Sequence, residues 1–470
     1  MSGFLGTSLA ILADSYKATH AFLYPEANKK CVAYGEFRSG YNNDKEDTRI
    51  LFYGFRYIIE NYVARQWTLQ DIELAEEFYE THNFNYTSFP FPKDLFLKFI
   101  EENDGYFPIK IEALPEGTSC HVHTPVYQII AEKEYAPLVT FMETLMTMTW
   151  YPSTVATLSR RARDIIEQAY FDTVNFTKSA TMSASYYVQF KLNNRKPVGT
   201  AVPSTEHSVM TAHKSEKDAI LHTIRRFGSG VYACVMDSFD YANALNNILP
   251  SVAAQKLEKG GVMILRPDSG DPIEVVLMAL RAADKVFGSY TNKKGYKILR
   301  GCSVVQGDAV TFESMKNILN AVKEAGYSVQ NITIGMGAGL LQKVNRDTMS
   351  FATKLCHITY ADGTQRDIMK APKTGSSKTS LPGEFVVKKN EHGVPIVYPK
   401  EACAENDPEN LLRVVYDHGK ISEWDDFDTI RKRVAKEWPL LPRTYDNISP
   451  ELKLKISKCL QEIKNIISQQ

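Results

Sequence analysis

The sequence predicts an α/β fold organised around a parallel sheet, because strand patterns and helix patterns alternate through its middle. Four short apolar runs, each closed by acidic or glycine residues, have the composition of strands that are buried on both faces. These runs lie in residues 231–240, 261–272, 302–310 and 331–341. Alternation of this kind is typical of parallel βαβ units.

Helical segments separate these strands. Residues 273–287 and 312–325 carry apolar side chains at three- and four-residue spacing, the pattern of a helix with one buried face. Parallel strands joined by such helices end at one edge of their sheet, and the chemistry of α/β proteins lies in the loops at that edge. We therefore expect the loops after the four strands to lie close together.

Charged and glycine-rich loops follow the predicted strands. They contain Asp237 after the first strand, Arg266 and Asp268 after the second, Gly307–Asp308 after the third and the glycine-rich residues 335–339 after the fourth. Arginine can bind oxyanions in bidentate fashion, and carboxylates accept hydrogen bonds from hydroxyl groups. A glycine-rich turn that opens a helix presents backbone N–H donors to an anion. Together these loops predict a site for an anionic, hydroxylated ligand such as a sugar phosphate.

The flanking segments predict a mixture of strands and helices. We expect strands at 33–38, 350–359 and 366–372, helices at 50–66, 70–81, 136–149, 157–170 and 209–227, a hairpin at 385–397 and a helical tail at 423–470. Ser204 or Thr205 is expected to cap the helix that follows the motif PSTEHS. His207, at that helix start, is either structural or faces a phosphate. The basic segment 370–378 is either a surface loop or an anion site.

The composition excludes several classes of partner. Lys and Arg together number 55 and Asp and Glu together number 55, so the net charge of zero indicates neither a nucleic-acid partner nor a membrane-surface partner. No apolar run reaches the length of a membrane span, and the N-terminus lacks the basic start of a signal peptide. Seven cysteines without a CxxC pair predict reduced thiols in the cytoplasm and no cysteine-based metal site.

A set of short motifs extends this interpretation. DSYKATH, YGEFR, WYPSTVAT with SRR, PSTEHS, MDSFD, LRPDSGDP, VVQGDAV, GMGAGLLQKVNRD and MKAPK occur in this order between about Ala10 and Pro372. The set resembles the nicotinamide phosphoribosyltransferases. The resemblance implies an irregular parallel (β/α) barrel of the type II phosphoribosyltransferase kind at 151–374, plus a mixed α/β domain formed by 1–150 together with 375–470. It also implies a homodimer with a shared active site.

The reaction implied by the resemblance belongs to NAD salvage. Nicotinamide and phosphoribosyl pyrophosphate would give nicotinamide mononucleotide and pyrophosphate. Mg²⁺ would accompany the substrate pyrophosphate, and ATP would stimulate the reaction by phosphorylating a histidine.

Positions that match the family motifs inherit expected roles. His207 corresponds to the phosphorylated histidine, Asp237 to an acid near the magnesium and pyrophosphate, and Tyr16 to an aromatic that reaches across the dimer to stack on nicotinamide. The expected ribose-phosphate contacts are Arg266, Asp268, Gly307, Asp308, Gly337 and Ala338, the last at a position that is usually glycine. The expected phosphate-binding cations are Arg38, Arg346, Lys354 and Lys370.

One segment departs from the family pattern. The family has a stretch H-D-F-G-x-R-G and a later T-D-T that hold the nicotinamide, and neither is found before PSTEHS. Residues 171–202 are short by about 30 residues, roughly one βαβ unit. Tyr186, Tyr187 and Asn193 are substitutes that no spacing supports. We therefore expect tighter binding of phosphoribosyl pyrophosphate than of nicotinamide, poor turnover and reduced stability. The alternatives are a catalytically impaired relative that binds phosphoribosyl ligands or a partner subunit, and a nicotinate phosphoribosyltransferase.

Overall fold

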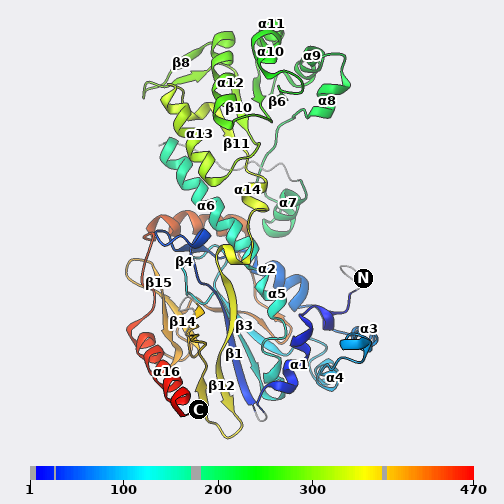
Figure 1. Ribbon diagram of the computed structural model, residues 1–470, viewed down its shortest axis with the longest axis vertical. Coiled ribbons are helices and arrows are strands. Elements are labelled where there is room, and N and C mark those ends of the chain that lie inside the picture. Colours follow the sequence, from blue (N-terminus) through cyan, green and yellow to red (C-terminus); the bar gives the residue numbers. More distant parts are fainter. Residues whose placement is uncertain (1–6, 26–27, 171–181, 373–377, 470) are drawn as a thin grey trace. The chain divides into compact units, whose positions relative to one another are not determined.

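The computed structural model of the chain describes residues 7–25, 28–170, 182–372 and 378–469 (Figure 1). The chain forms two compact units. Unit 1 consists of Met1–Thr157 together with Asn345–Gln470, and unit 2 consists of Leu158–Val344. Each unit has its own hydrophobic core.

Unit 1 contains a seven-stranded sheet with the strand order β13-β12-β1-β5-β3-β16-β17. The strands are β1 (Asn28–Phe37), β3 (Ile109–Ala113), β5 (Tyr127–Glu132), β12 (Phe351–Tyr360), β13 (Gln365–Asp367), β16 (Arg413–Asp417) and β17 (Lys420–Ile421). All neighbouring pairs are antiparallel. The long strands β1 and β12 lie side by side and join the N-terminal and C-terminal parts of the chain (Figure 1).

Helices and two small two-stranded sheets complete unit 1. The helices are α1 (Ser15–Leu23), α2 (Phe55–Ile58), α3 (Leu69–Tyr79), α4 (Lys93–Glu102), α5 (Glu143–Thr147), α15 (Phe427–Glu437) and α16 (Pro450–Gln469). The short strands β2 (Arg49–Leu51) and β4 (Ser119–His121) pair with each other, as do β14 (Phe385–Lys389) and β15 (Pro395–Pro399). A cluster of fully buried aromatic rings around Trp67 fills the core beside α4. Aromatic pairs of this kind stabilise a core beyond their buried area alone.

Unit 2 contains the predicted parallel sheet. Its strands are β6 (Val231–Val235), β7 (Val262–Arg266), β10 (Cys302–Gln306) and β11 (Ile332–Ile334), in the order β11-β10-β7-β6. All three neighbouring pairs are parallel, so the four loops that follow the strands leave the sheet at the same edge. The alternation of strand and helix patterns in the sequence is confirmed for all four strands.

Unit 2 also contains helices, some of which begin at a capping side chain. They are α6 (Trp150–Tyr170, which starts in unit 1), α7 (Met182–Tyr187), α8 (His207–Ala212), α9 (Glu216–Phe227), α10 (Tyr241–Asn243), α11 (Leu249–Lys259), α12 (Pro272–Phe287), α13 (Phe312–Glu324) and α14 (Ala338–Leu341). The Asp271 carboxylate caps α12 by accepting hydrogen bonds from the backbone N–H groups of Ile273 and Glu274. Thr311 caps α13 in the same way.

The motif PSTEHS continues the sheet beyond β6. Ala233 donates its backbone N–H to the Pro203 carbonyl at 2.9 Å, and Thr205 donates its own to the Ala233 carbonyl at 3.0 Å. The Thr205 hydroxyl accepts a hydrogen bond from the backbone N–H of Val235 at 2.9 Å. The prediction that Ser204 or Thr205 caps the next helix is therefore wrong. The Thr205 side chain binds the neighbouring strand instead, and the N-cap position belongs to Glu206, whose side chain makes no capping bond.

Three other predictions differ from the structure. Residues 345–374 were expected in the barrel-like domain, but β12 pairs with β1 over nearly its whole length and places this stretch in unit 1. The helix expected at 50–66 starts only at Phe55, after a short strand. The helix expected at 136–149 is broken, because Pro137 lies in a 3₁₀ segment and the α-helix spans only Glu143–Thr147. The expected hairpin at 385–397 is confirmed as β14 and β15.

The buried His121 makes the stability of unit 1 depend on pH. Only 1% of its surface is exposed, and burial lowers its pKa to about 4. Between pH 6.5 and 4 the native imidazole is neutral and the unfolded one is protonated, so the unfolded state binds more protons. The stabilisation is therefore complete above pH 6.5 and falls by about 3 kcal/mol as the pH drops to 4.

Thermal unfolding measured across this pH range tests the effect. We expect His121→Gln to flatten the decline in Tm between pH 6.5 and 4. The matched control is His392→Gln, which removes an exposed histidine and should leave the wild-type slope. An identical slope in His121→Gln and wild type would contradict the assignment.

Candidate active site

A hydrogen-bonded network lies at the carboxyl edge of the parallel sheet and is centred on Asp268. Its Oδ1 atom accepts a hydrogen bond from the Arg266 guanidinium at 2.9 Å. Its Oδ2 atom lies 3.3 Å from His207 Nε2. Asp268 thus fixes both the arginine and the histidine.

Asp237 joins the loop after β6 to the loop after β7. Its Oδ2 atom accepts hydrogen bonds from the backbone N–H of Asp268 at 2.8 Å and from the Ser269 hydroxyl at 2.6 Å. Its Oδ1 atom is buried and has no hydrogen-bond partner among the described residues. A buried carboxylate oxygen without a partner is costly, so this atom is available to a ligand, a cation or a water molecule.

The serine after Asp237 reaches the histidine. Ser238 Oγ lies 3.2 Å from His207 Nδ1, so both ring nitrogens of His207 have partners. The backbone N–H of Ser238 donates to the Glu216 carboxylate at 3.2 Å. Burial raises the pKa of Glu216, hydrogen bonds from the backbone oppose that rise, and the nearby Asp237 charge adds to it. Glu216 therefore holds the loop that carries Asp237 and Ser238.

The glycine loops after β10 and β11 approach each other closely. A side chain at Gly339 would come within 2.3 Å of the Val310 carbonyl oxygen, and one at Gly335 within 3.4 Å of the Gly307 Cα. The Gln306 side-chain amide donates to the Asp308 carbonyl at 3.0 Å, and the Gly335 N–H donates to the Gln306 carbonyl at 2.8 Å. The contact at Gly339 leaves no room for a side chain there, and the hydrogen bonds hold both loops at the same edge as Asp268.

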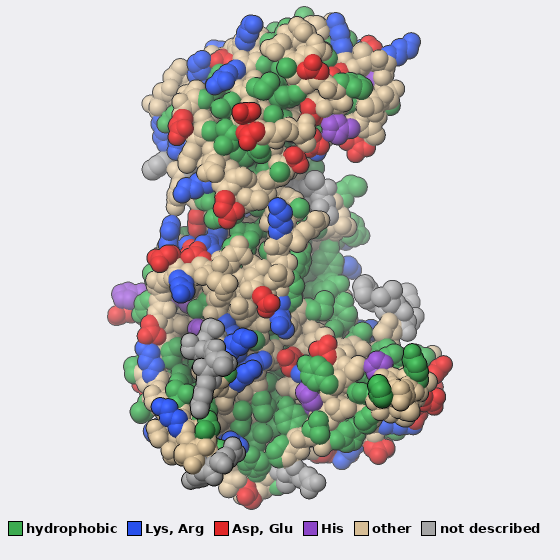
Figure 2. Space-filling view, viewed as in Figure 1, with side chains coloured by type: hydrophobic (Ala, Val, Ile, Leu, Met, Phe, Trp, Pro, Cys, Tyr) green, Lys and Arg blue, Asp and Glu red, His purple; other side chains and the backbone are tan. Residues whose placement is uncertain are grey.

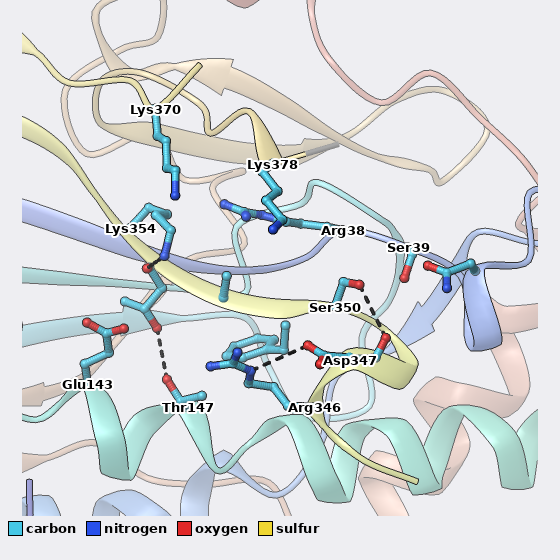
Figure 3. Close-up of a pocket in the computed structure, with 14 residues that line it drawn as sticks. Arg38, Ser39, Glu143, Thr147, Arg346, Asp347, Ser350, Lys354, Lys370 and Lys378 are labelled. Carbon is cyan, nitrogen blue, oxygen red and sulfur yellow. Dashed lines mark hydrogen bonds and ion pairs between the residues drawn. The ribbon is translucent and has the colours of Figure 1, made fainter. Parts of the chain in front are cut away.

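A second group of candidate residues lies in unit 1, around a cavity of about 430 Å³. The cations that line it are Arg38, Arg346, Lys354, Lys370 and Lys378, and its lining also includes the carboxylates of Glu143 and Asp347 (Figure 3). Figure 2 shows blue Lys and Arg side chains gathered over this part of unit 1. The cavity unites all four predicted phosphate-binding cations and adds Lys378, from the segment that the sequence left open between a surface loop and an anion site.

The positive charges in this cavity act on one another. Burial lowers the pKa of Lys354, and Arg38, Lys370 and Lys17 lower it further, while Glu143 partly compensates. A bound anion would offset this repulsion and favour the protonated ammonium group. The cavity is therefore suited to a multiply charged anion such as a phosphate or a pyrophosphate.

Tyr16 lies on the first turn of α1 in the same unit, and 54% of its surface is exposed. Its pKa is raised, first by partial burial and then by the charges of Glu143 and Asp14, while Arg346 lowers it. The next residue, Lys17, is buried and forms an ion pair with Glu143. This ion pair ties α1 to the wall of the cavity and leaves the Tyr16 ring accessible.

The structure describes the acceptor candidates only in part, since 171–181 lie outside the described residues. Tyr186 is exposed on α7 and contacts the Phe190 ring, whose centroid lies 5.0 Å from the Arg195 guanidinium. Asn193 is buried and donates a hydrogen bond to the Lys196 carbonyl. The ring contact of Tyr186 and this hydrogen bond of Asn193 both join neighbours within residues 186–196 and do not reach the network around Asp268.

Sequence reasoning missed some members of the network around Asp268. Ser238 and Ser269 follow predicted acids directly, so their position at the end of a strand was the available signal. Glu216 gave no signal, because it reaches the site from a helix start far from the motif that it supports. No cluster of three or more metal-binding side chains occurs among the described residues, and no described helix is long and apolar enough to cross a membrane.

Comparison with solved structures defines the class of fold. The chain superimposes on human nicotinic acid phosphoribosyltransferase with a TM-score of 0.63 at 16% identity, covering 95% of this chain and 100% of that one. It superimposes on nicotinate-nucleotide pyrophosphorylase from Pyrococcus furiosus with a TM-score of 0.58 at 15% identity, covering 94% and 99%. The fold is therefore that of the type II phosphoribosyltransferases.

Sequence comparison then gives the family. Residues 161–420 match the model of the nicotinate phosphoribosyltransferase (NAPRTase) family, and the chain belongs to this family. Residues 8–111 match the N-terminal domain of nicotinamide phosphoribosyltransferase. The chain is 29% identical to the nicotinamide phosphoribosyltransferase of Xanthomonas campestris pv. campestris, over 89% of this chain and 96% of that protein. It is 25% identical to the enzyme of the same name from Acinetobacter baylyi, over 90% and 96%.

Replacing Arg266 tests the network around Asp268. Arg266→Ala removes a guanidinium that can bind a phosphate or a hydroxyl, and we expect it to weaken binding of phosphoribosyl pyrophosphate by at least about 1.5–3 kcal/mol, or roughly 10- to 100-fold. Isothermal calorimetry measures the change. The control is Arg226→Ala, an exposed arginine at the end of α9 that should bind as the wild type does. Unchanged affinity in Arg266→Ala would refute the proposed contact.

Proposed function

We propose that this protein is a nicotinamide phosphoribosyltransferase that acts in NAD salvage. It would convert nicotinamide and phosphoribosyl pyrophosphate to nicotinamide mononucleotide and pyrophosphate. The observation that carries the proposal is the network of Arg266, Asp268, His207 and Asp237 at the carboxyl edge of the parallel sheet. The match of residues 8–111 to the nicotinamide phosphoribosyltransferase N-terminal domain supports nicotinamide over nicotinate as the acceptor.

The chemistry requires charge stabilisation more than proton transfer. The bond between the anomeric carbon and the pyrophosphate oxygen breaks, and the neutral ring nitrogen of nicotinamide forms the new bond to that carbon. Negative charge develops on the departing pyrophosphate, so preorganised cations and N–H donors lower the barrier. Asp268 and Arg266 suit the ribose and its phosphate, together with the loops at Gly307–Asp308 and Gly337–Ala338. The cationic side chains Arg38, Arg346, Lys354 and Lys370 suit the phosphate groups.

Mg²⁺ fits the donor network through Asp237. The Oδ1 atom of Asp237 has no partner among the described residues, and carboxylate oxygen is the ligand that Mg²⁺ prefers. When bound, Mg²⁺ would neutralise part of the pyrophosphate charge. Asp237 itself orients the loop after β7 through the Asp268 backbone and the Ser269 hydroxyl.

Several further features belong to the proposal. We infer a homodimer in which Tyr16 of one subunit stacks on nicotinamide bound to the other, since 54% of the surface of Tyr16 is exposed. A cytoplasmic location fits the seven cysteines, none of which forms a disulfide. Neither a nucleic acid nor a membrane is proposed as a partner.

ATP is proposed as a stimulating co-substrate that phosphorylates His207. The imidazole is half exposed, opens α8 and is oriented by Asp268 on one nitrogen and Ser238 on the other. Incubation with γ-labelled ATP should give an acid-labile label on the wild type and none on His207→Ala. The control is His222→Ala on α9, which should label as the wild type does. Equal labelling of His207→Ala and wild type would dismiss the role.

Turnover with two acceptors decides between the proposed function and its alternatives. We expect nicotinamide mononucleotide as the product, formed slowly, with tighter binding of phosphoribosyl pyrophosphate than of nicotinamide, because the sequence before PSTEHS contains no match to the family stretches that hold nicotinamide. Formation of nicotinate mononucleotide alone would identify a nicotinate phosphoribosyltransferase. Binding of phosphoribosyl pyrophosphate without either product would identify a catalytically impaired relative. Rapid synthesis of nicotinamide mononucleotide would show that the acceptor pocket is complete.

A further inference from the structure

The guanidinium of Arg38 is unusual among the cations of the unit 1 cavity. Its side chain is only 8% exposed, although it lines the cavity. Its Nη2 atom is buried and has no hydrogen-bond partner among the described residues. A buried N–H donor without a partner costs free energy unless a ligand or a water molecule completes it. Arg38 is therefore held in a position that an incoming acceptor would satisfy.

A buried carboxylate holds Arg38 in this position. Glu36 is wholly buried, and its Oε1 atom accepts a hydrogen bond from Arg38 Nε at 2.8 Å. Glu36 lies near the end of β1 and Arg38 directly follows the last residue of that strand, so their side chains, two positions apart, leave the same face of the extended chain. The hydrogen bond to Glu36 uses the Nε edge of the guanidinium and leaves Nη2 available to an acceptor. An arginine that is fixed by one edge keeps its planar fork in a single orientation.

A histidine holds the carboxylate in turn. His123 Nδ1 donates to Glu36 Oε2 at 3.2 Å, so both oxygens of Glu36 have partners. The backbone of His123 has a φ of 63°, in the left-handed region, and its N–H donates to the Phe37 carbonyl at 2.7 Å. This conformation is uncommon for residues other than glycine. The tight turn thus brings the His123 ring to Glu36 at the end of β1, next to Arg38.

The charge of Glu36 works against simple attraction of anions. A buried carboxylate next to the cavity lowers its positive potential, which five cations otherwise create. If the cavity bound phosphate by charge alone, a neutral residue at position 36 would bind it better. A carboxylate at position 36 favours phosphate binding only if the free energy gained by orienting Arg38 exceeds the electrostatic attraction that the negative charge of Glu36 removes.

We propose that Glu36, held by His123, is a positioning residue for phosphate recognition in this cavity. It fixes Arg38 through Nε so that Nη2 meets an oxygen of the pyrophosphate group. The proposal rests on the proposed phosphoribosyl transfer and names residues that make no contact with the substrate themselves. If Glu36 acts by orienting Arg38, a neutral residue at position 36 should weaken phosphate binding. If only the charge of Glu36 matters, the same substitution should strengthen it.

The experiment measures the binding of inorganic pyrophosphate to the full chain by calorimetry. Glu36→Gln keeps the size of the side chain and removes its charge. We expect it to weaken binding about tenfold, because a neutral amide holds the guanidinium less firmly. The control is Glu60→Gln. Glu60 accepts a hydrogen bond of the same kind and length, 2.8 Å, from Arg56 Nε, but this pair lies outside the cavity. Glu60→Gln should bind as the wild type does. Unchanged or tighter binding by Glu36→Gln would overturn the proposal.

A double-mutant cycle separates positioning from a general effect on folding. In an Arg38→Ala background, Glu36→Gln should cause no further loss of affinity, since Glu36 acts through Arg38. Additive losses would indicate a purely structural role and would overturn the proposal. Glu36→Asp retains the charge but draws the carboxylate back, so it should also weaken binding, and it serves as the second variant if Glu36→Gln unfolds.

Steady-state kinetics give an independent reading. Glu36→Gln should raise the KM for phosphoribosyl pyrophosphate more than it lowers kcat, whereas a loss of folded protein would lower kcat alone. The proposed function and the role of Glu36 can be refuted separately. Wild type that neither binds pyrophosphate nor forms product would refute the proposed function. Wild type that binds pyrophosphate while Glu36→Gln binds equally well would refute only the role of Glu36.

Discussion

The pairing of residues 203–205 with β6 is the interaction on which the donor network depends. It fixes the chain immediately before His207 to the edge of the parallel sheet through two backbone hydrogen bonds and the Thr205 hydroxyl. His207 can then meet Ser238 from β6 and Asp268 from β7, two loops that Asp237 ties together. His207 is exposed and lies on a helix of only six residues. Without this short extension of the sheet, nothing would hold it next to Asp268.

Two buried atoms of opposite character stand out in the two units. Asp237 Oδ1 is an acceptor and Arg38 Nη2 is a donor, and neither has a partner among the described residues. Another atom of each side chain is hydrogen-bonded, Asp237 Oδ2 to two donors and Arg38 Nε to Glu36, and this restricts the position of both groups. A chain with no net charge thus concentrates local charge at fixed points. Preorganisation of this kind reduces the entropy that a ligand must lose on binding.

The sequence was sufficient for the parallel sheet, because continuous β-branched runs and amphipathic helices are local patterns. It also located Asp237, Arg266 and Asp268 at a common edge, since parallel pairing fixes where strands end. The assignment of residues 345–374 to unit 1 could not be predicted, because it depends on a pairing between β1 and β12 across most of the chain. The contacts of Glu36 and Glu216 were equally hidden. A buried carboxylate looks like any other acidic residue until its partners are known.

Unit 1 is discontinuous in sequence, and this affects the order in which a ribosome can deliver a foldable chain. Strand β1 pairs on one side with β5 and on the other with β12. Asn28, at the start of β1, pairs with Tyr360, so this second pairing can form only after Tyr360 has been synthesised. All of unit 2 is synthesised in between. During that interval one edge of β1 has unpaired backbone groups, the condition under which nascent chains associate wrongly. Unit 2, whose sheet contacts are contained in one continuous stretch, can close earlier and shortens the effective loop that β12 must bridge. Unit 1 is the first unit to leave the ribosome and the last to be completed. Dependence on chaperones during synthesis would therefore be concentrated in unit 1.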